Sequence, residues 1–236
     1  MTRRRWIADE FSNGYAALIG EHADHLIRVL RVRLGQQFDI VASHGVVYRG
    51  RVRKISESRV EFELLGEIDA ATPVLLTLLL SVFKFDRMEW AIEKCTELGV
   101  AKIVPVIARR TDAHLAAASV KRGERWRRIA TQAAEQSRRA GPPEVTPPLK
   151  LQDAVSLPGA LRIVLSEMES RTQLGNVLAA SCGEVLLAIG PEGGWTNDEL
   201  QVFQKTGWIS ASLGPTILRV ETAAIAATAI IVAARG

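Results

Sequence analysis

A continuous apolar run over residues 74–83 constrains the fold most, because a strand without polar alternation must be covered on both faces. Residues 86–98 follow with apolar side chains at helical spacing, and Gly99 supplies a helix stop. Residues 102–107 read as another strand. A strand, a helix and a strand in this order make a βαβ unit, which predicts a parallel sheet.

The same alternation continues toward the C-terminus. We expect strands at 161–165, 184–189 and 209–213, and helices at 173–180 and 221–234. Between the last two strands, Thr196 and Glu199 have the spacing of a capping box, which predicts that a helix starts directly after the sequence GPEGGW. The region 74–236 therefore reads as one α/β domain with a mostly parallel sheet.

Residues 1–70 instead read as short strands and turns. Two apolar segments, 38–41 and 46–52, flank Ser43-His44-Gly45 and predict a hairpin, while 59–64 alternates with period two. A short helix is expected over 22–30. We predict a small β-rich domain, a barrel in form, joined to the second domain by a linker at 69–73.

The net positive charge of the chain is small, but basic side chains are concentrated in one segment. The formal net charge is +4, but residues 121–139 contain seven basic side chains against two acidic ones. This stretch lies on an expected helix over 123–139 that Ala140-Gly141-Pro142-Pro143 ends. Such a helix either meets phosphates or presents a solvated face, and the sequence alone leaves both interpretations open.

Other classes are disfavoured. The two cysteines, Cys95 and Cys182, are far apart and show no metal-ligand spacing, so we expect no metal and a packed free thiol at Cys95. No apolar stretch has transmembrane length, and the basic N-terminus lacks the apolar segment of a signal peptide. We therefore expect a cytoplasmic protein that uses no membrane.

Three expected strand ends carry unusual loops, namely Leu165-Ser166-Glu167, Gly190 to Gly194, and Leu213 to Leu218. Ligands of open parallel sheets bind beyond the carboxyl ends of strands, so we expect these loops to form one pocket. The glycine loop has neither the lysine of a phosphate-binding loop nor the dinucleotide fingerprint. An acidic, amide-rich loop suits a neutral or cationic ligand; the alternative is a tight turn in which Glu192 caps locally.

The sequence resembles the bacterial 16S rRNA uridine-N3 methyltransferases, the small-subunit methyltransferase E family of the SPOUT class. The resemblance rests on motifs in the same order along nearly the whole chain: RWI at 5–7, HLIRVLR at 25–31, FKFDRMEW at 83–90, EKCTELGV at 93–100, RWRRI at 125–129, AAEQSRR at 133–139, IGPEGGW at 189–195 and LGPTILRVETA at 213–223.

The resemblance implies S-adenosylmethionine as cofactor, a deep trefoil knot in the C-terminal domain, a homodimer, and a PUA-like N-terminal barrel that helps to grip RNA of the 30S subunit. Carried over by position, the residues implied to bind the cofactor are Leu165, Ser166, Gly190, Glu192, Gly193, Gly194, Leu213, Gly214, Ile217 and Leu218. Met88 and Trp90 are expected to be core residues rather than site residues.

Methylation at uracil N3 requires loss of the N3 proton, and charge then spreads onto O2 and O4. Arg219 directly follows the third loop and is the expected catalytic cation; the alternative is that it pairs with Glu221 or a carboxylate at the dimer interface. Expected RNA contacts are Arg5, Arg31, Arg125, Arg128 and Arg138. The motifs identify no general base. Two other functions stay open: a SPOUT enzyme acting on another base or on tRNA, and a catalytically silent RNA-binding module.

Overall fold

The structure, a computed structural model, describes residues 5–12, 14–42, 45–68, 74–178 and 183–235. The chain divides into two compact units. The first comprises Met1–Thr72 with Ala134–Pro142, and the second comprises Pro73–Ala133 with Pro143–Gly236. The sequence-based boundary near residue 70 lies close to this division, but residues 134–142, which we placed in the second domain, pack with the first unit.

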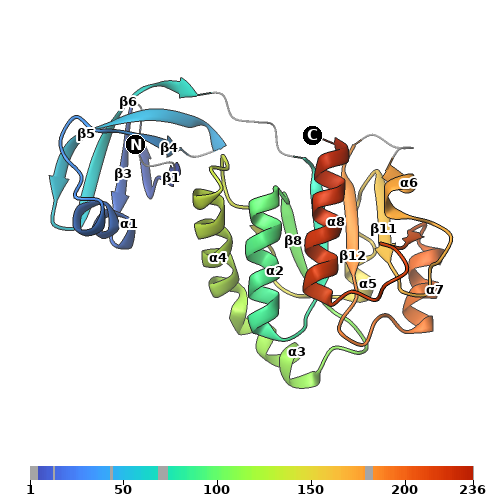
Figure 1. Cartoon of the computed structure of the whole chain (residues 1–236). Coiled ribbons are helices and arrows are strands. Elements are labelled where there is room, and N and C mark those ends of the chain that lie inside the picture. Colours follow the sequence, from blue (N-terminus) through green and yellow to red (C-terminus); the bar gives the residue numbers. More distant parts are fainter. Residues whose placement is uncertain (1–4, 13, 43–44, 69–73, 179–182, 236) are drawn as a thin grey trace. The chain divides into compact units, whose positions relative to one another are not determined.

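The second unit is built on a parallel sheet (Figure 1). Its strands run in the spatial order β10-β8-β7-β12-β11-β13, and β9 pairs with β8. The strands are β7 (Leu76–Ser81), β8 (Lys102–Ile107), β9 (Glu144–Val145), β10 (Leu149–Lys150), β11 (Leu161–Leu165), β12 (Val185–Ile189) and β13 (Ile209–Ala211). All pairings recorded between these strands are parallel, as the βαβ pattern predicts.

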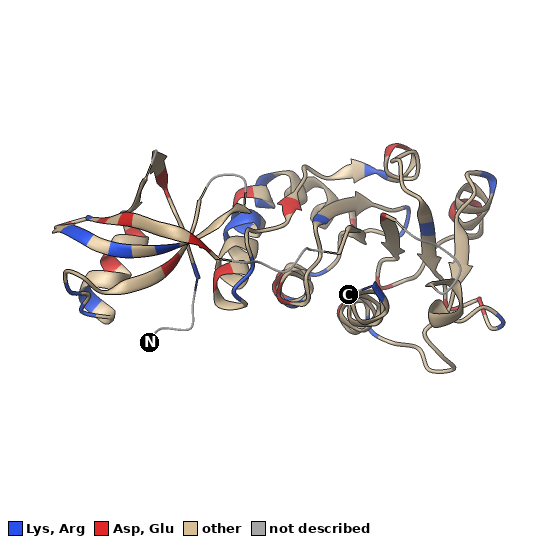
Figure 2. Cartoon of the chain, turned by 90° about the horizontal axis from the view of Figure 1, so that it is seen from above, with Lys and Arg blue, Asp and Glu red and all other residues tan. Residues whose placement is uncertain are grey.

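Helices cover both faces of this sheet (Figure 2). The helices are α2 (Phe85–Leu98), α3 (Ala113–Ser119), a 3-10 turn (Val120–Arg122), α4 (Gly123–Gln136), α5 (Leu151–Ala154), α6 (Leu174–Leu178), α7 (Asn197–Lys205) and α8 (Val220–Arg235). Along β12, Leu187 packs with the core under α2, α6 and α8, whereas Leu186 and Ala188 pack with the core under α5 and α7. Both faces of β12 are therefore apolar, which explains its uninterrupted apolar sequence.

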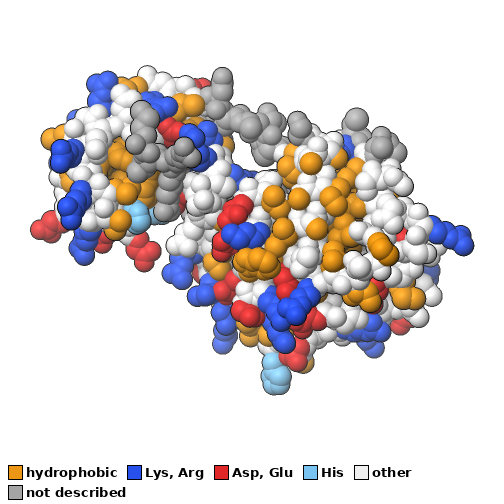
Figure 3. Space-filling view, in the orientation of Figure 1, with side chains coloured by type: hydrophobic (Ala, Val, Ile, Leu, Met, Phe, Trp, Pro, Cys, Tyr) orange, Lys and Arg blue, Asp and Glu red, His pale blue; other side chains and the backbone are white. Residues whose placement is uncertain are grey.

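One face of α8 is apolar and is left uncovered by the part of the chain that the structure describes. Ile230 is 40% exposed, and Ala229 and Ala233 lie on the same outer side. Apolar side chains gather over α8 and α2 on the face shown in Figure 3. A contiguous apolar surface of this kind marks an interaction face more often than a solvated one.

The first unit is a curled six-stranded sheet in the order β1-β4-β5-β6-β3-β2. Its strands are β1 (Arg5–Ile7), β2 (Glu10–Ser12), β3 (Tyr15–Ile19), β4 (Gln37–Val41), β5 (Val47–Ser56) and β6 (Arg59–Ile68), and α1 (Glu21–Asp24) continues as a π-helical turn over His25–Val29. The predicted hairpin is confirmed by antiparallel pairing of β4 with β5. Gly50 is required there because a side chain would meet Ile40 at 2.6 Å. Residues 43–44 and the expected linker at 69–73 lie outside the described residues.

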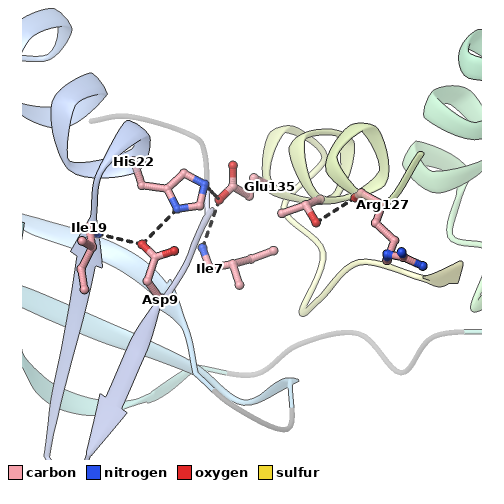
Figure 4. A network of polar contacts seen from close by, with 7 residues as sticks. Ile7, Asp9, Ile19, His22, Arg127 and Glu135 are labelled. Carbon is pink, nitrogen blue, oxygen red and sulfur yellow. Dashed lines mark hydrogen bonds and ion pairs between the residues drawn. The ribbon is translucent and has the colours of Figure 1, made fainter. Parts of the chain in front are cut away.

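A polar network explains why the end of α4 belongs to the first unit (Figure 4). Glu135 is fully buried, and its Oε1 accepts a hydrogen bond from the backbone N–H of Ile7 at 3.3 Å. The same oxygen lies 3.6 Å from Nε2 of His22, whose Nδ1 lies 3.2 Å from Asp9. These contacts join β1 and α1 to a segment that follows them by more than a hundred residues in sequence, a separation that local patterns do not reveal.

Two expectations need correction. The helix expected over 123–139 ends at Gln136, because Arg138 turns into the left-handed region with φ +62° and the Arg139 N–H bonds back to the Ala134 carbonyl at 2.9 Å. The interpretation of Trp90 as a core residue is wrong: Trp90 is 48% exposed, whereas Met88 is buried as expected. A helix turns by about 100° per residue, so Trp90 lies on the opposite side of α2 from Met88.

Within the described ranges, no helix combines the length and the apolar character needed to cross a membrane.

Cys95 should be chemically inert in the native protein. It is fully buried under α8, where the Thr228 hydroxyl donates to its Sγ at 3.5 Å, and burial raises the pKa of the thiol to about 12. In a Cys182→Ser variant, Cys95 is the only thiol of the chain. We expect a disulfide reagent at pH 8 to label it slowly in the native protein and quickly in guanidinium, where the pKa returns to about 8.5. Rapid labelling of the native variant would contradict this packing.

Candidate functional site

A cavity of about 390 Å³ lies at the carboxyl ends of β12, β11 and β13, which are neighbours in the sheet. This volume is within the range of small-molecule sites, roughly 300–1,000 Å³. The wall contains the following residues singled out from the sequence: Leu165, Ser166, Gly190, Glu192, Gly194, Leu213, Gly214, Ile217, Leu218 and Arg219. The three loops that follow these strands thus meet at one site, as the parallel arrangement predicts.

The glycine loop after β12 is shaped by close contacts. A side chain at Gly190 would meet the indole ring of Trp195 at 3.2 Å. Gly194 has φ +67°, its N–H bonds to the Pro191 carbonyl at 2.8 Å, and a side chain there would meet Glu167 at 3.0 Å. Glycine at 190 and 194 therefore serves the turn and its packing, and leaves main chain in the cavity wall.

Trp195 connects this loop to the neighbouring strand, a role that sequence reasoning missed. Its indole N–H donates to the carbonyl of Leu165 at 3.1 Å, at the end of β11, and the ring packs edge-on against Phe203 of α7. The one sequence signal for this contact was the general rule that a buried indole N–H usually finds a hydrogen-bond partner. The contact fixes the spacing between the first and second loops of the site.

Gly193 differs from its neighbours in the loop, because it packs against Arg110 rather than into the cavity wall. Arg110 follows β8, and its Nη1 donates to the Gly193 carbonyl at 2.6 Å and to the Trp195 carbonyl at 3.4 Å. The backbone N–H of the adjacent Arg109 donates to Glu199 at 2.7 Å. The loop after β8 therefore supports the glycine loop from behind.

The capping box predicted for α7 is confirmed. The Thr196 hydroxyl accepts from the Glu199 N–H at 3.3 Å, and Glu199 accepts from the Thr196 N–H at 2.8 Å. This reciprocal pair starts α7 immediately after the glycine loop, so the loop is held between the end of a strand and a capped helix.

The first and third loops are held against each other by main-chain contacts. The Ser166 N–H donates to the Ala211 carbonyl at 3.1 Å, and the Ser212 N–H donates to the Thr172 carbonyl at 2.8 Å. Glu169 shapes the first loop by accepting from the Arg171 and Thr172 N–H groups, which lowers the pKa of its carboxyl. In the third loop, Ile217 lines the cavity with a side chain that is 82% exposed.

Charges of both signs face the site. Arg87, at the start of α2, lies 3.8 Å from Glu192 of the glycine loop and 3.7 Å from Glu221 in the first turn of α8. Glu221 is only 5% exposed. Its ion pair is with Arg87 and not, as the sequence-based alternative held, with Arg219, whose exposed side chain lies on the cavity wall. Arg87 and Glu221 lie inside sequence motifs but were not assigned to the site.

The arginines expected to contact RNA fall into two groups. Within the second unit, Arg125 makes a two-point contact with Glu89, at 2.6 and 2.7 Å, while Arg128 is exposed. Within the first unit, Arg31 is exposed with φ +49°, and Arg5 donates to the Arg138 carbonyl at 2.5 Å. The structure thus brings Arg5 and Arg138 together, and gives Arg125 a carboxylate partner.

The site can bind an organic ligand by backbone groups, apolar side chains and a few charges. Among the residues that the structure describes, no cluster of three or more His, Cys, Asp or Glu side chains is arranged to hold a metal ion. The charged groups at the cavity are instead Arg87 between the two carboxylates of Glu192 and Glu221, with Glu167 and Arg219 also on the wall.

Comparisons with known proteins agree with one another. A family model described as an RNA methyltransferase domain matches residues 70–232, and one described as an RNA methyltransferase PUA domain matches residues 18–65. The Ribosomal RNA small subunit methyltransferase E of Synechocystis is 34% identical over 210 residues, covering 87% of this chain and 68% of the relative.

Two solved structures are similar over nearly their whole length. The Neisseria gonorrhoeae Ribosomal RNA small subunit methyltransferase E, bound to S-adenosyl methionine, has a TM-score of 0.86 and 32% identity, covering 96% of this chain and 95% of that one. A Legionella pneumophila protein in complex with the same cofactor has a TM-score of 0.87 and 28% identity, covering 100% and 99%. The chain therefore belongs to the ribosomal RNA small subunit methyltransferase E family.

Proposed function

We propose that this protein transfers a methyl group from S-adenosylmethionine to N3 of a specific uridine in the 16S ribosomal RNA of the small subunit. The proposal rests on the cavity at which the glycine loop meets the loops after β11 and β13. This cavity lies in the domain that matches the RNA methyltransferase family model. Membership of the family supports the substrate class; the choice of uridine N3 rests on the motif resemblance.

The residues at the cavity fit the cofactor. Main chain at Gly190, Gly194 and Gly214 leaves room for a flat base, with apolar contacts from Leu165 and Leu218. Glu192 and Glu221 supply negative charge that suits the ammonium and sulfonium groups. The cofactor supplies an activated methyl group on that sulfonium. Gly193 supports the loop through Arg110 and contributes indirectly.

Arg219 is the proposed catalytic residue. When uracil N3 loses its proton, negative charge develops on O2 and O4, and a guanidinium at the cavity wall lowers the energy of that charge. Because Glu221 already pairs with Arg87, the Arg219 side chain is available for this role. No general base is assigned: either water takes the N3 proton, or the uracil binds with N3 already ionised.

The family resemblance completes the architecture that we propose. The first unit acts as a PUA-like RNA-binding module, the second holds the cofactor within a trefoil knot, and two copies associate as a homodimer. The uncovered apolar face of α8, with Ile230 exposed, supports dimerisation (Figure 3). Arg5, Arg31, Arg128 and Arg138 are the proposed RNA contacts, with Arg125 a weaker one because Glu89 holds it.

The deciding experiment is mass spectrometry of ribosomal RNA nucleosides. Assembled 30S subunits, naked 16S RNA and tRNA from a strain lacking the gene are each incubated with the pure protein and S-adenosylmethionine. We expect 3-methyluridine to appear in the 30S subunits, in the naked 16S RNA or in both. A different methylated nucleoside, or activity only on tRNA, would replace uridine N3; no product on any RNA would favour a silent RNA-binding module.

Gly194→Val should weaken cofactor binding about tenfold or more, because a branched residue at φ +67° is strained and would meet Glu167. Gly175→Val is the matched control, since Gly175 has open space around it and ordinary φ. Calorimetric titration with S-adenosylmethionine measures both variants. Equal affinities in the two variants would remove the glycine loop from the proposed cofactor site.

Arg219→Ala should lower turnover by about a hundredfold while leaving cofactor affinity nearly unchanged, since it removes one preorganised donor to the developing charge. Lys205→Ala, which removes an exposed cation from the end of α7, serves as control and should keep normal turnover. Single-turnover assays with saturating RNA measure the methyl-transfer step. Wild-type rates in Arg219→Ala would exclude a catalytic role for that residue.

A further inference from the structure

Asp39 is the centre of a cluster of arginines in the first unit. It is 9% exposed, with Nη1 of Arg49 lying 3.3 Å from Oδ1 and Nη2 of Arg138 lying 3.0 Å from Oδ2. Arg5 joins the cluster by donating to the Arg138 carbonyl. Two guanidinium groups thus contact one carboxylate and a third lies beside them, which leaves an excess of positive charge at this point.

The strand register explains how this cluster forms. Arg5 of β1 pairs with Asp39 of β4, and Asp39 pairs with Arg49 of β5, so the three side chains share one face of the curled sheet. Arg138 reaches the same carboxylate from the segment that follows α4. The cluster therefore combines residues from the two parts of the chain that make up the first unit.

The contacts with Asp39 leave much of the binding capacity of the arginines unused. Each of these contacts involves one terminal nitrogen of a guanidinium that carries five N–H donors. The side chains of Arg49 and Arg138 are 39% and 50% exposed, so their remaining donors can meet a ligand from solvent. The Nε of Arg5 is buried without a hydrogen-bond partner among the described residues.

The cluster is electrostatically short of negative charge. The pKa of Arg5 is lowered, first by burial and then by the nearby charge of Arg138, and Asp39 compensates only in part. An additional anion beside these groups would relieve the repulsion between the guanidinium groups.

The conformation of Arg138 argues against a purely structural purpose. At the position after a helix where φ is positive, glycine is usual, and a residue with a side chain costs about 1–2 kcal/mol. An arginine at φ +62° makes the turn less stable than a glycine would, which indicates that the Arg138 side chain has a use of its own.

We propose that Arg5, Arg49 and Arg138 form a phosphate-binding site for the RNA backbone, with Asp39 aligning the guanidinium groups. Guanidinium forks match phosphate oxygens in two-point contacts, whereas a single carboxylate cannot satisfy three of them. The proposal adds Arg49 to the expected RNA contacts and rests on the proposed function in taking RNA as the ligand; the chemistry alone would also accept free phosphate.

The test compares Arg49→Ala with Arg51→Ala. Arg51 lies two residues farther along the same face of β5 and pairs loosely with Glu63 at 3.9 Å, away from Asp39. Binding of a fluorescent single-stranded oligouridylate to the full chain is measured over a range of KCl concentrations. We expect Arg49→Ala to weaken binding about fivefold at low salt and to reduce the salt slope by about one. Arg49→Lys should restore the salt slope, because it keeps the charge, but only part of the affinity, because lysine lacks the guanidinium fork.

Arg51→Ala should stay close to wild type. If Arg51→Ala loses as much RNA affinity as Arg49→Ala, RNA is attracted by a diffuse basic face and the proposed site is refuted. The proposed site is also refuted if Arg49→Ala binds RNA as the wild type does.

Arg138→Gly separates binding from folding, because glycine accepts the left-handed turn without strain. We expect weaker RNA binding with an unchanged or higher melting temperature. A lower melting temperature with wild-type RNA binding would make the cluster a structural ion pair and overturn the proposal.

Two further measurements identify the ligand. Inorganic phosphate, added against chloride at constant ionic strength, should compete with RNA on the wild type and much less on Arg49→Ala. If phosphate binds through Arg49 while RNA affinity does not depend on that residue, the RNA assignment is wrong. These binding results do not need methyl transfer, so an inactive protein with an Arg49-dependent salt slope would refute the proposed function and leave the site standing.

Discussion

The parallel pairing of β11 with both β12 and β13 is the constraint on which the candidate site depends. Parallel strands end at the same edge of a sheet, so three segments separated along the chain deliver their loops to one place. The register then fixes the spacing: Val164 pairs with Ala188 on one side and with Ser210 on the other. A shift of one residue in any of these strands would exchange the side chains on its two faces and also displace its loop.

Strand pairing sets the position of the loops, but a second layer of contacts sets their shape. The Trp195 indole joins the glycine loop to the end of β11, and Arg110 holds the Gly193 and Trp195 carbonyls from the side of β8. Neither side chain depends on a ligand for its partner. Loops that approach a ligand with bare main chain need such support, because glycine itself restricts the backbone least of all residues.

The sequence predicted most of the architecture because its signals are local. Apolar runs, helical spacing and the capping box at Thr196 identify elements that the structure confirms, and parallel topology then predicts a common pocket. The missed features come from contacts between distant segments. Burial of Glu135 beside Ile7, the bond from Arg110 to Gly193 and the pairing of Arg138 with Asp39 have no local pattern. The same reason explains why the sequence did not indicate that residues 134–142 pack with the first unit.

Arg87 shows how the charge of the site is arranged. One guanidinium serves two carboxylates, yet both separations exceed 3.5 Å, so neither Glu192 nor Glu221 is held by a short charge-assisted bond. Within the described residues, Oε2 of the buried Glu221 also lacks a hydrogen-bond partner. A buried carboxylate oxygen without a partner is costly in a ligand-free protein, and a cationic ligand reduces that cost on binding. The electrostatics of this wall therefore favour a positively charged molecule over a phosphate. The glycine loop indicates the same preference, because it contains Glu192 and lacks the lysine of a phosphate-binding loop.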